Sequence, residues 1–479
     1  MRILVIGAFG TIGRKLVPAL VAKGHTVSVS SRNARKEIPW PELGCERYTL
    51  DLLSASSIPP ALEGIDVIYY LMHGMSDGEQ HSEREVRAAQ NLVASIQQST
   101  VKRIIYMGSL LSDTPQSEHM QARLATGKVL ASSPIAVTEL RAGIIIAPGS
   151  AAFEVMRDMV GNLPWVVTPN SIHTLAPPIA LSNIVVYLTG FLDLPETQGK
   201  TYEATGPEWM SYRDMMERLA AHMGWRCRIV STQHLPMSLA TAVLGIVTSV
   251  PKSLAKALIE GLSERLQANP APLQTLIPQT LVAYEDALSQ LLEEETVEVY
   301  PKRWEDGVPA FRNFSHRHGF YSKCASQSIT VPASAKSVWQ VVNLLGGEHR
   351  YFYMDILWAM REWMDWCMGG NGRDHGRDDP TMLRVGERVD SWRILSVEQE
   401  SLLVMKFGMK APGGGGMQIT IEPKSKQSCE LNVELLWHPA GFMGLAYWYF
   451  YAPWHQLLLN GMTEKMSQLA MDIEQGQTP

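Results

Sequence analysis

A triplet of glycines between an apolar segment and an amphipathic segment is the feature that most constrains this chain. Residues 3–6 (Ile-Leu-Val-Ile) predict a buried strand, and the apolar side chains of residues 12–20 recur at helical spacing. A strand, a glycine turn and a helix in this order bring backbone N–H groups and a helix N-terminus close to a pyrophosphate. An ordinary tight turn is the alternative, but the flanking strand and helix favour a dinucleotide site. The residues predicted to form it are Gly7, Phe9, Gly10, Thr11, Ile12 and Gly13.

The end of the second predicted strand indicates which dinucleotide binds. Residues 26–30 (Thr-Val-Ser-Val-Ser) form that strand, and Ser31 and Arg32 follow it. An acidic residue at this place accepts from the ribose 2′-hydroxyl of NAD, whereas small polar residues with an arginine accept the 2′-phosphate of NADP. No acid stands here, so the sequence predicts NADP. NAD is the alternative, with Arg32 as a solvated turn residue.

Further strands alternate with helices along the first part of the chain. Residues 45–50, 65–72 and 103–108 predict strands. The alternation predicts an α/β fold with a doubly wound parallel sheet. Asp51, followed by Leu52, is placed either to accept from an adenine amino group or to cap a helix. Ligands of such sheets lie at the carboxyl ends of the strands. The residues nominated in this way for the nicotinamide side are Leu71, Met72, His73, Gly108 and Ser109.

Three motifs together resemble the extended and atypical short-chain dehydrogenase/reductase superfamily. They are Gly7-x-x-Gly10-x-x-Gly13, the Asp51-Leu52 pair and the segment Tyr106-Met-Gly-Ser109, and the resemblance covers residues 1–230. It implies a Rossmann fold in which Ser109 polarises a substrate carbonyl and a Tyr-x-x-x-Lys pair on the next helix supplies a proton. No tyrosine lies between Tyr106 and Tyr187, so that pair is missing.

His119 and Arg123 are the candidates for the role of the missing pair. They stand four residues apart, hence on one face of the predicted helix. Histidine moves a proton near neutral pH, and arginine is a fixed cation that stabilises a developing oxyanion. The predicted catalytic set is therefore Ser109, His119 and Arg123. The alternative is that His119 and Arg123 form a surface pair on a scaffold that binds a nucleotide without reacting.

The rest of the chain follows a different pattern. Residues 231–325 predict a mainly helical connecting or capping segment with proline-punctuated loops and no catalytic motif. Residues 326–479 predict two helices, a meander of short strands and a long last helix, which is an α+β order. Gly413 to Gly416 are predicted to form a hairpin turn within this meander.

This second, smaller domain resembles the helix-grip folds of START-like and polyketide-cyclase-like proteins. The whole chain is similar to bacterial proteins that pair an atypical short-chain dehydrogenase-like domain with a domain of unknown function. The resemblance implies a curved sheet around the last helix and an apolar cavity. Six aromatic residues are predicted either to line a cavity for an apolar small molecule or to fill the core. They are Trp339, Trp358, Trp363, Trp437, Tyr447 and Trp448.

Composition excludes several classes of function. The chain has 48 acidic and 42 basic residues and no basic run, which argues against nucleic-acid binding. Its five cysteines are scattered, which favours the reducing cytoplasm. The polar, glycine-rich residues 369–379 match no zinc or calcium spacing, so no metal is predicted. The apolar residues 235–250 and 444–459 are shorter than the roughly 20 residues of a spanning helix. They predict buried helices, with peripheral membrane contact through residues 235–250 as the alternative.

These features together predict a cytoplasmic NADP(H)-binding protein. The leading hypothesis is an oxidoreductase acting on a small or apolar carbonyl-type substrate. The alternative is a non-catalytic nucleotide or redox sensor, or a ligand-binding protein, with a degenerate dehydrogenase site.

Overall fold

The computed structural model describes residues 1–33, 38–72, 81–97, 99–248, 250–295, 318, 320, 322–367, 369–370, 372, 377, 379 and 382–476. The chain divides into two compact units. The first unit consists of Met1–Val160, Trp165–Ile246 and Val250–Glu294. The second consists of Glu295–Pro479 together with the short stretches Gly161–Pro164 and Val247–Ser249.

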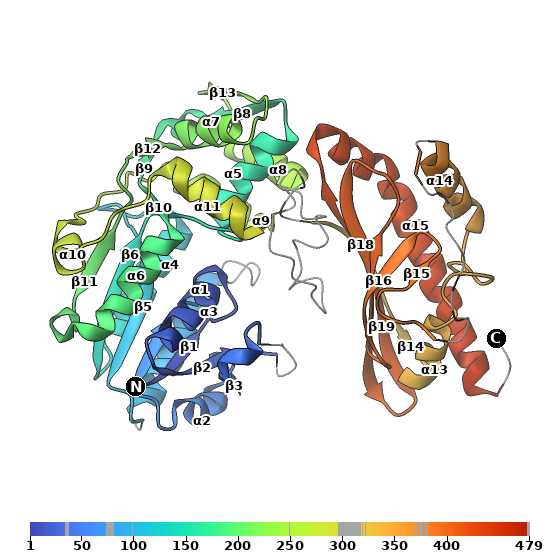
Figure 1. Cartoon of the computed structure of the whole chain (residues 1–479), viewed down its shortest axis with the longest axis horizontal. Coiled ribbons are helices and arrows are strands. Elements are labelled where there is room, and N and C mark those ends of the chain that lie inside the picture. Colours follow the sequence, from blue (N-terminus) through green and yellow to red (C-terminus); the bar gives the residue numbers. More distant parts are fainter. Residues whose placement is uncertain are drawn as a thin grey trace. The chain divides into compact units, whose positions relative to one another are not determined.

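A seven-stranded sheet forms the centre of the first unit (Figure 1). From edge to edge its strands are β11 (Thr201–Ala204), β6 (Ala136–Ala142), β5 (Arg103–Ser109), β4 (Val67–Tyr70), β1 (Arg2–Ile6), β2 (Thr26–Ser31) and β3 (Glu46–Thr49). Every neighbouring pair is parallel. The strand order reverses its direction at β1, as it does in doubly wound folds. The predicted doubly wound parallel sheet is confirmed.

Alternate residues of each strand pack on opposite faces of this sheet, as strand geometry requires. Ile3 and Val5 pack on the face covered by α1 (Thr11–Ala22) and α6 (Leu181–Gly190). Leu4 and Ile6 pack on the other face, which is covered by three helices. Those helices are α2 (Ile58–Leu62), α3 (His81–Ile96) and α4 (Glu118–Ala131). Both faces are buried, which explains why the central strands are continuous apolar runs.

Helices and two-stranded sheets follow the central strands in the first unit. The helices are α5 (Ala151–Asn162), α7 (Tyr212–His222), α8 (Met237–Thr248), α9 (Lys252–Gly261), α10 (Ala271–Leu276) and α11 (Tyr284–Glu295). The small sheets pair β7 (Ile144–Ile146) with β10 (Pro178–Ala180), β8 (Trp165–Pro169) with β13 (Arg228–Thr232), and β9 (Leu175–Ala176) with β12 (Met210–Ser211). Helix α10 occupies part of a predicted loop, because proline is tolerated in a first helical turn.

The second unit contains a six-stranded antiparallel sheet. Its strands lie in the order β14 (Lys323–Val331), β19 (Ser428–Pro439), β18 (Gly413–Ser425), β17 (Leu402–Phe407), β16 (Trp392–Glu398) and β15 (Arg388–Val389). Its described helices are α13 (Ala335–Val342), α14 (Asp355–Cys367) and α15 (Gly441–Glu474). Helix α15 packs against β14, β19 and α13. The predicted order of two helices, a meander and a long last helix is confirmed.

The predicted hairpin turn at Gly413 to Gly416 is wrong, because these glycines begin β18 and pair with β19. A Cβ on Gly413 would lie 2.4 Å from the carbonyl oxygen of His438 and 2.6 Å from the ring of Trp437. A Cβ on Gly415 would lie 2.3 Å from the carbonyl oxygen of Leu436. Glycine is therefore required for close packing of two strands, and not for a turn.

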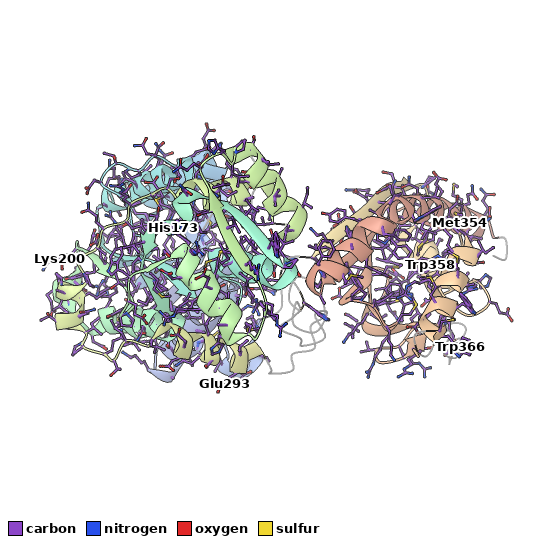
Figure 2. All side chains as sticks on the ribbon, turned by 90° about the horizontal axis from the view of Figure 1, so that it is seen from above. His173, Lys200, Glu293, Met354, Trp358 and Trp366 are labelled. Carbon is purple, nitrogen blue, oxygen red and sulfur yellow. The ribbon has the colours of Figure 1, made fainter. Side chains whose placement is uncertain are left out.

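The six predicted aromatic residues of the second unit divide into three groups. Trp358, Trp437, Tyr447 and Trp448 line a cavity. Trp339 lies in the hydrophobic core instead. The side chain of Trp363 is 62% exposed, so it belongs to neither. Helix α14, on which Trp358 and Trp366 are labelled in Figure 2, thus carries both cavity-lining and exposed aromatic residues.

Within the described residues, no helix combines the length and the apolar character needed to cross a membrane. Residues 235–250 largely form α8, and residues 444–459 lie within α15. Leu239 and Ile246 are exposed on α8, so the proposed peripheral contact stays a prediction.

Candidate functional site

The glycine turn joins β1 to α1 and leaves no side chain at the start of the helix. Gly7 has a φ of +89°, and a Cβ there would lie 3.0 Å from the carbonyl carbon of Leu71. Gly10 is the N-cap residue of α1, and no side chain caps the first turn. A Cβ on Gly13 would lie 2.5 Å from both Ala8 Cα and the Gly7 carbonyl oxygen. These residues fit a pyrophosphate, because bare backbone N–H groups stand at the positive end of a helix.

The side chains around the turn leave this end of the helix accessible. Phe9, Thr11 and Ile12 are each half-buried. The carbonyl oxygen of Phe9 accepts a hydrogen bond from Arg14 Nε at 3.0 Å, which holds the turn against α1. The predicted turn residues therefore lie together at one helix N-terminus.

The predicted contacts after β2 and β3 lie at the neighbouring strand ends. Ser31 ends β2, where its hydroxyl accepts from the backbone N–H of Asn33 at 3.1 Å, and Arg32 is exposed. Asp51 Oδ1 accepts from the backbone N–H of Leu53 at 3.0 Å. Helix α2 begins only at Ile58, so the helix-capping alternative for Asp51 is wrong and its carboxylate closes a turn. Leu52, by contrast, is buried.

The predicted nicotinamide-side residues follow β4 and β5. The backbone N–H of Leu71 donates to the carbonyl oxygen of Ile6 at 2.9 Å, so the end of β4 runs beside the glycine turn. Met72 is half-buried, and His73 lies outside the described residues. Gly108 is buried, and a Cβ on it would lie 2.7 Å from Glu139 Oε1. The strand ends are therefore adjacent, as the parallel order requires.

Arg123 is held in a buried ion pair below these strand ends. Its Nη1 lies 2.7 Å from Glu85 Oε1, and the two side chains are 2% and 0% exposed. The guanidinium also donates to the carbonyl oxygens of Met72 and Met107, and it lies 5.2 Å from the ring centroid of Tyr106. Burial lowers the pKa of Arg123 but Tyr106 and Glu85 raise it, with a net increase, so the cation persists. Arg123 therefore ties β4 to β5, and the surface-pair alternative is wrong for this residue.

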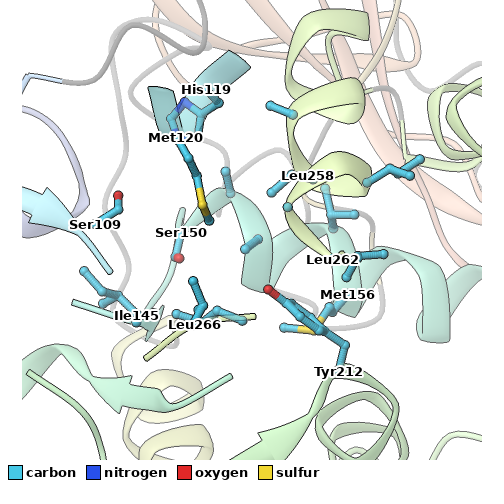
Figure 3. A pocket seen from close by; sticks show the side chains of 18 of the residues that line it. Ser109, His119, Met120, Ile145, Ser150, Met156, Tyr212, Leu258, Leu262 and Leu266 are labelled. Atoms are coloured by element: carbon cyan, nitrogen blue, oxygen red, sulfur yellow. The ribbon is translucent and has the colours of Figure 1, made fainter. Parts of the chain in front are cut away.

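A pocket of about 290 Å³ lies beside the same strand ends (Figure 3). Ser109, His119 and Arg123 all line it, and so does Ile12 in the first turn of α1. The structure therefore brings the predicted catalytic set and the glycine-turn helix to one pocket.

Three polar residues of this pocket, Ser150, Thr168 and Tyr212, are absent from the site that the sequence predicts. Tyr212, at the start of α7, directs its hydroxyl into the pocket (Figure 3). Burial raises the pKa of Tyr212 to about 12, so the hydroxyl stays protonated and can donate a hydrogen bond near neutral pH. No local motif marks this tyrosine, because it is distant in sequence from the strand ends that it faces.

The helical segment predicted to carry no chemistry supplies an apolar wall of the pocket. Ala240, Val243 and Leu244 of α8 line it, and so do Leu258 of α9 and Leu262 just after it. In Figure 3 Leu258 and Leu262 lie on the side of the pocket opposite Ser109. The apolar spacing of three and four residues is the one signal in the sequence that indicates this face.

Glu264 fastens this wall to the loop between β5 and α4. Its Oε1 accepts from the backbone N–H groups of Gln116 at 2.7 Å and Ser117 at 2.8 Å, and its Oε2 accepts from the Ser112 hydroxyl at 2.5 Å. Burial raises the pKa of Glu264, but these hydrogen bonds lower it by a larger amount, so the net pKa lies below that of an ordinary glutamate. The contact therefore stabilises the fold at pH values above the ordinary pKa of glutamate. This stabilisation is lost as the pH falls through the lowered pKa of Glu264.

No group of three metal-ligating side chains occurs among the described residues. Asp374, His375 and Asp378 of the glycine-rich segment lie outside them.

The two units match two different protein families. Residues 7–156 match a family described as NAD(P)H-binding. Residues 321–462 match a family described as a protein of unknown function (DUF2867). Each match lies within one unit of the structure.

Several curated proteins are similar to parts of the chain. It is 29% identical over 143 residues to the Photosystem II assembly factor Ycf39 of Synechocystis sp., which covers 29% of this chain and 44% of that protein. It is 27% identical over 225 residues to Ycf39 of Trieres chinensis, with coverage of 46% and 69%. It is 31% identical over 121 residues to a 3-beta-hydroxysteroid dehydrogenase of Mycolicibacterium neoaurum, with coverage of 22% and 32%. The chain thus spans less than half of the first relative.

A solved structure of a nucleoside-diphosphate-sugar epimerase from Staphylococcus aureus shares the fold of the first unit. The TM-score is 0.51 at 17% identity, and the likeness covers 60% of this chain and 99% of the epimerase. At this identity the likeness shows the fold alone.

Proposed function

We propose that the protein is an NADP(H)-dependent oxidoreductase that acts on an apolar carbonyl compound or on the corresponding alcohol. The premise is that its first unit is an NAD(P)-binding Rossmann domain of the short-chain dehydrogenase-like kind. One observation carries the proposal. Ile12 of the glycine-turn helix and the polar residues Ser109 and His119 line the same apolar pocket. A dinucleotide on the turn and a substrate in the pocket would therefore meet at the ends of β4 and β5.

The choice of NADP rests on the residues after β2. Ser31 is half-buried at the strand end and Arg32 is exposed beside it, with no carboxylate at either position. An arginine and a hydroxyl suit a 2′-phosphate, whereas an acid there would repel it. Asp51 and Leu52 at the end of β3 are proposed to border the adenine. His73 belongs to the same proposed site, on the sequence pattern alone.

The residues of the chain have distinct proposed roles in carbonyl reduction. When bound, NADPH supplies a hydride to the carbonyl carbon. The hydroxyl of Ser109 donates a hydrogen bond to the carbonyl oxygen and polarises it. His119 delivers the proton that this oxygen takes up, so that an alcohol forms. Arg123 keeps the carbonyl groups of Met72 and Met107 in place and adds a fixed positive charge below the site.

The class of substrate follows from the composition of the pocket. Its walls are mostly Leu, Ile, Val, Met and Ala side chains, with few polar groups. Tyr212 offers one hydrogen-bond donor away from the strand ends, which suits an apolar molecule with a second polar group. A relative over part of the first unit is named a 3-beta-hydroxysteroid dehydrogenase, which is consistent with an apolar substrate.

Titration with NADPH and with NADH, followed by nicotinamide fluorescence, tests the cofactor. We expect NADPH to bind roughly tenfold or more tightly, because Arg32 adds a charge-assisted hydrogen bond to the 2′-phosphate. Arg32→Ala should remove this preference, and Arg213→Ala, an exposed arginine on α7, should keep it. Tighter binding of NADH would contradict the choice of NADP, and binding of neither would end the proposal.

Turnover of apolar ketones and aldehydes with NADPH tests the catalytic roles. We expect Ser109→Ala and His119→Ala each to lower kcat/KM by roughly 10²-fold, because each removes a group that acts on the developing oxyanion. Ser95→Ala on α3 and His222→Ala on α7, which lie outside the pocket, are the matched controls and should change it little. Unchanged turnover in either site variant would remove that residue from the mechanism.

A second candidate function is a non-catalytic sensor of the NADP(H) state. The buried Arg123–Glu85 pair favours it, because the arginine has a structural partner at the place of the missing Tyr-x-x-x-Lys pair. Relatives named as Photosystem II assembly factors are also consistent with a role other than turnover. Tight NADPH binding with no turnover on any carbonyl compound would favour the sensor over the oxidoreductase.

We also propose that the second unit has the helix-grip, START-like architecture. The support is its antiparallel six-stranded sheet and the packing of the 34-residue helix α15 against β14 and β19. We propose residues 326–479 as this domain, residues 1–230 as the Rossmann domain and residues 231–325 as the connecting and capping segment.

A further inference from the structure

The second unit contains a half-open cavity of about 490 Å³ whose apolar wall is rich in aromatic side chains. Helices α14 and α15 supply one part of this wall, and strands β16 to β19 supply the other. The residues of α15 that line it, from Tyr447 to Leu458, recur at helical spacing and so form one face of the helix. The volume lies in the range of small-molecule sites, which is roughly 300–1,000 Å³.

The aromatic wall is a continuous series of ring contacts. The ring centroids of Trp392 and Phe407 are 5.4 Å apart, those of Phe407 and Trp437 are 5.8 Å apart, and those of Trp437 and Tyr447 are 5.1 Å apart. The first two pairs pack edge to face and the third is tilted, and such ring contacts hold the side chains in place. Gly416, which also lines the cavity, adds no side chain to fill it. The cavity is therefore preformed, and contacts between neighbouring rings hold its aromatic side chains in position.

Arg361 places a positive charge in this apolar wall. It stands on α14, three residues after Trp358, which Figure 2 labels, and its side chain is buried. Its Nε donates to the Tyr447 hydroxyl at 2.8 Å and its Nη2 donates to the carbonyl oxygen of Lys410 at 2.8 Å. Its Nη1 is buried and has no hydrogen-bond partner among the residues that the structure describes.

No carboxylate of the described residues pairs with Arg361. The acid one turn further along α14, Asp365, accepts from the backbone N–H groups of Gly372 at 2.8 Å and Lys410 at 2.5 Å. The aromatic rings of Phe407 and Tyr447 lie 5.5 and 5.6 Å from the guanidinium carbon, and they compensate the charge only in part. Arginine cannot lose its proton in a protein, so a buried guanidinium with a vacant N–H is poised for an anion.

Two further polar atoms in the cavity wall are buried and have no hydrogen-bond partner within the described part of the chain. They are Trp392 Nε1, which is a donor, and His455 Nδ1. Burial lowers the pKa of His455 to about 4, so the imidazole is neutral near pH 7 and adds no second charge. Buried polar groups in native proteins are almost always satisfied, so these two atoms are available to hydrogen-bond a molecule in the cavity.

We propose that this cavity binds an amphipathic carboxylate, with the carboxylate on Arg361 and the apolar body against the aromatic wall. The binding is independent of the dinucleotide chemistry proposed for the first unit. Met360, Trp454 and Phe450 line the cavity and are 50%, 44% and 71% exposed, so they form an apolar rim through which the ligand enters. Ligands of this class include fatty acids and aromatic acids.

Tryptophan fluorescence of the full chain, titrated with dodecanoate and with naphthoate, tests the proposal, and dodecanol and naphthol are the uncharged probes. We expect the acids to bind more tightly than the alcohols. Arg361→Met should weaken binding of the acids by roughly 10- to 100-fold, the effect of losing a charge-assisted hydrogen bond, and should leave the alcohols unchanged. Arg393→Met, an exposed arginine of β16 outside this cavity, should change neither.

Thermal unfolding shows whether a variant binds the acids more weakly because it lacks the ligand contact or because it is less stable. Without ligand, Arg361→Met should unfold no earlier than the natural chain, because the substitution removes a buried charge that lacks an ion-pair partner. Leu458→Trp, which fills the cavity from α15, should abolish binding of acids and alcohols alike. Binding of neither acid by the natural chain, equal weakening of acid and alcohol by Arg361→Met, or acid binding that survives Leu458→Trp would each overturn the proposal.

Discussion

Replacement of Gly13 by alanine is expected to abolish NADPH binding and to destabilise the first unit. The new Cβ would lie 2.5 Å from Ala8 Cα, the Ala8 carbonyl oxygen and the Gly7 carbonyl oxygen. All three are backbone atoms of the turn, so α1 must move away from β1 to admit the methyl group. Overpacking of this kind costs about 1–3 kcal/mol of unfolding free energy. The displaced helix would also withdraw its N-terminal N–H groups from the pyrophosphate, so we expect affinity to fall by roughly 10²-fold or more.

Gly10→Ala, in the same turn, tests the effect on NADPH binding without the effect on stability. Its Cβ would meet only the Gly7 carbonyl oxygen, at 3.4 Å, and its φ of −79° suits alanine. We therefore expect a melting temperature close to that of the natural chain together with weakened NADPH binding. Gly245→Ala on α8, where a Cβ has nothing within 4 Å, should change neither property. Full NADPH affinity in both Gly10→Ala and Gly13→Ala would show that the turn does not hold the dinucleotide.

The sheet of the first unit was predictable because its signals are local. Each central strand is buried on both faces and therefore appears as a short continuous apolar run, as residues 3–6 do. Gly13 is required by backbone contacts with neighbours in sequence, Gly7 and Ala8. A reader of the sequence can thus infer both the strands and the helix that opens beside them.

The apolar wall of the pocket could not be distinguished from ordinary core by its sequence. Val243 and Leu244 recur at the spacing that a core-facing helix shows, and nothing local indicates that they face a cavity. Tyr212 was missed for a related reason, since its partners in the pocket come from other parts of the chain. Long-range contacts decide which apolar face lines a site.

For the glycines of β18, the local sequence pattern predicts a feature that the structure does not contain. Four consecutive glycines between alternating segments are typical of a turn, which is what the pattern of Gly413 to Gly416 predicts. Gly413 and Gly415 are required by the bulk of Trp437 on the neighbouring strand and by the close approach of that strand's backbone. A cross-strand contact that spans more than twenty residues leaves no trace in the local pattern.

Arg123→Met is expected to cost the first unit about 3–5 kcal/mol of unfolding free energy, because it breaks the buried ion pair with Glu85. The two side chains are 2% and 0% exposed, so water cannot replace the lost contact. The carbonyl oxygens of Met72 and Met107 lose a donor as well. Urea unfolding, followed by far-ultraviolet circular dichroism, measures the effect. Arg213→Ala, which breaks the exposed pair with Glu217 on α7, is the control and should cost roughly 0.3–0.5 kcal/mol.

A second substitution decides whether the ion pair of Arg123 or its hydrogen bonds to the strand ends contribute more to stability. In the double variant Arg123→Met with Glu85→Leu, both charges are gone and the site is apolar, so most of the lost stability should return. If the double variant is as unstable as Arg123→Met, then the hydrogen bonds from Arg123 to the two strand ends, and not the broken ion pair, dominate the loss of stability. If Arg123→Met is as stable as the control, Arg123 does not fasten β4 to β5. It would then be available for the oxyanion role that its position beside His119 first suggested.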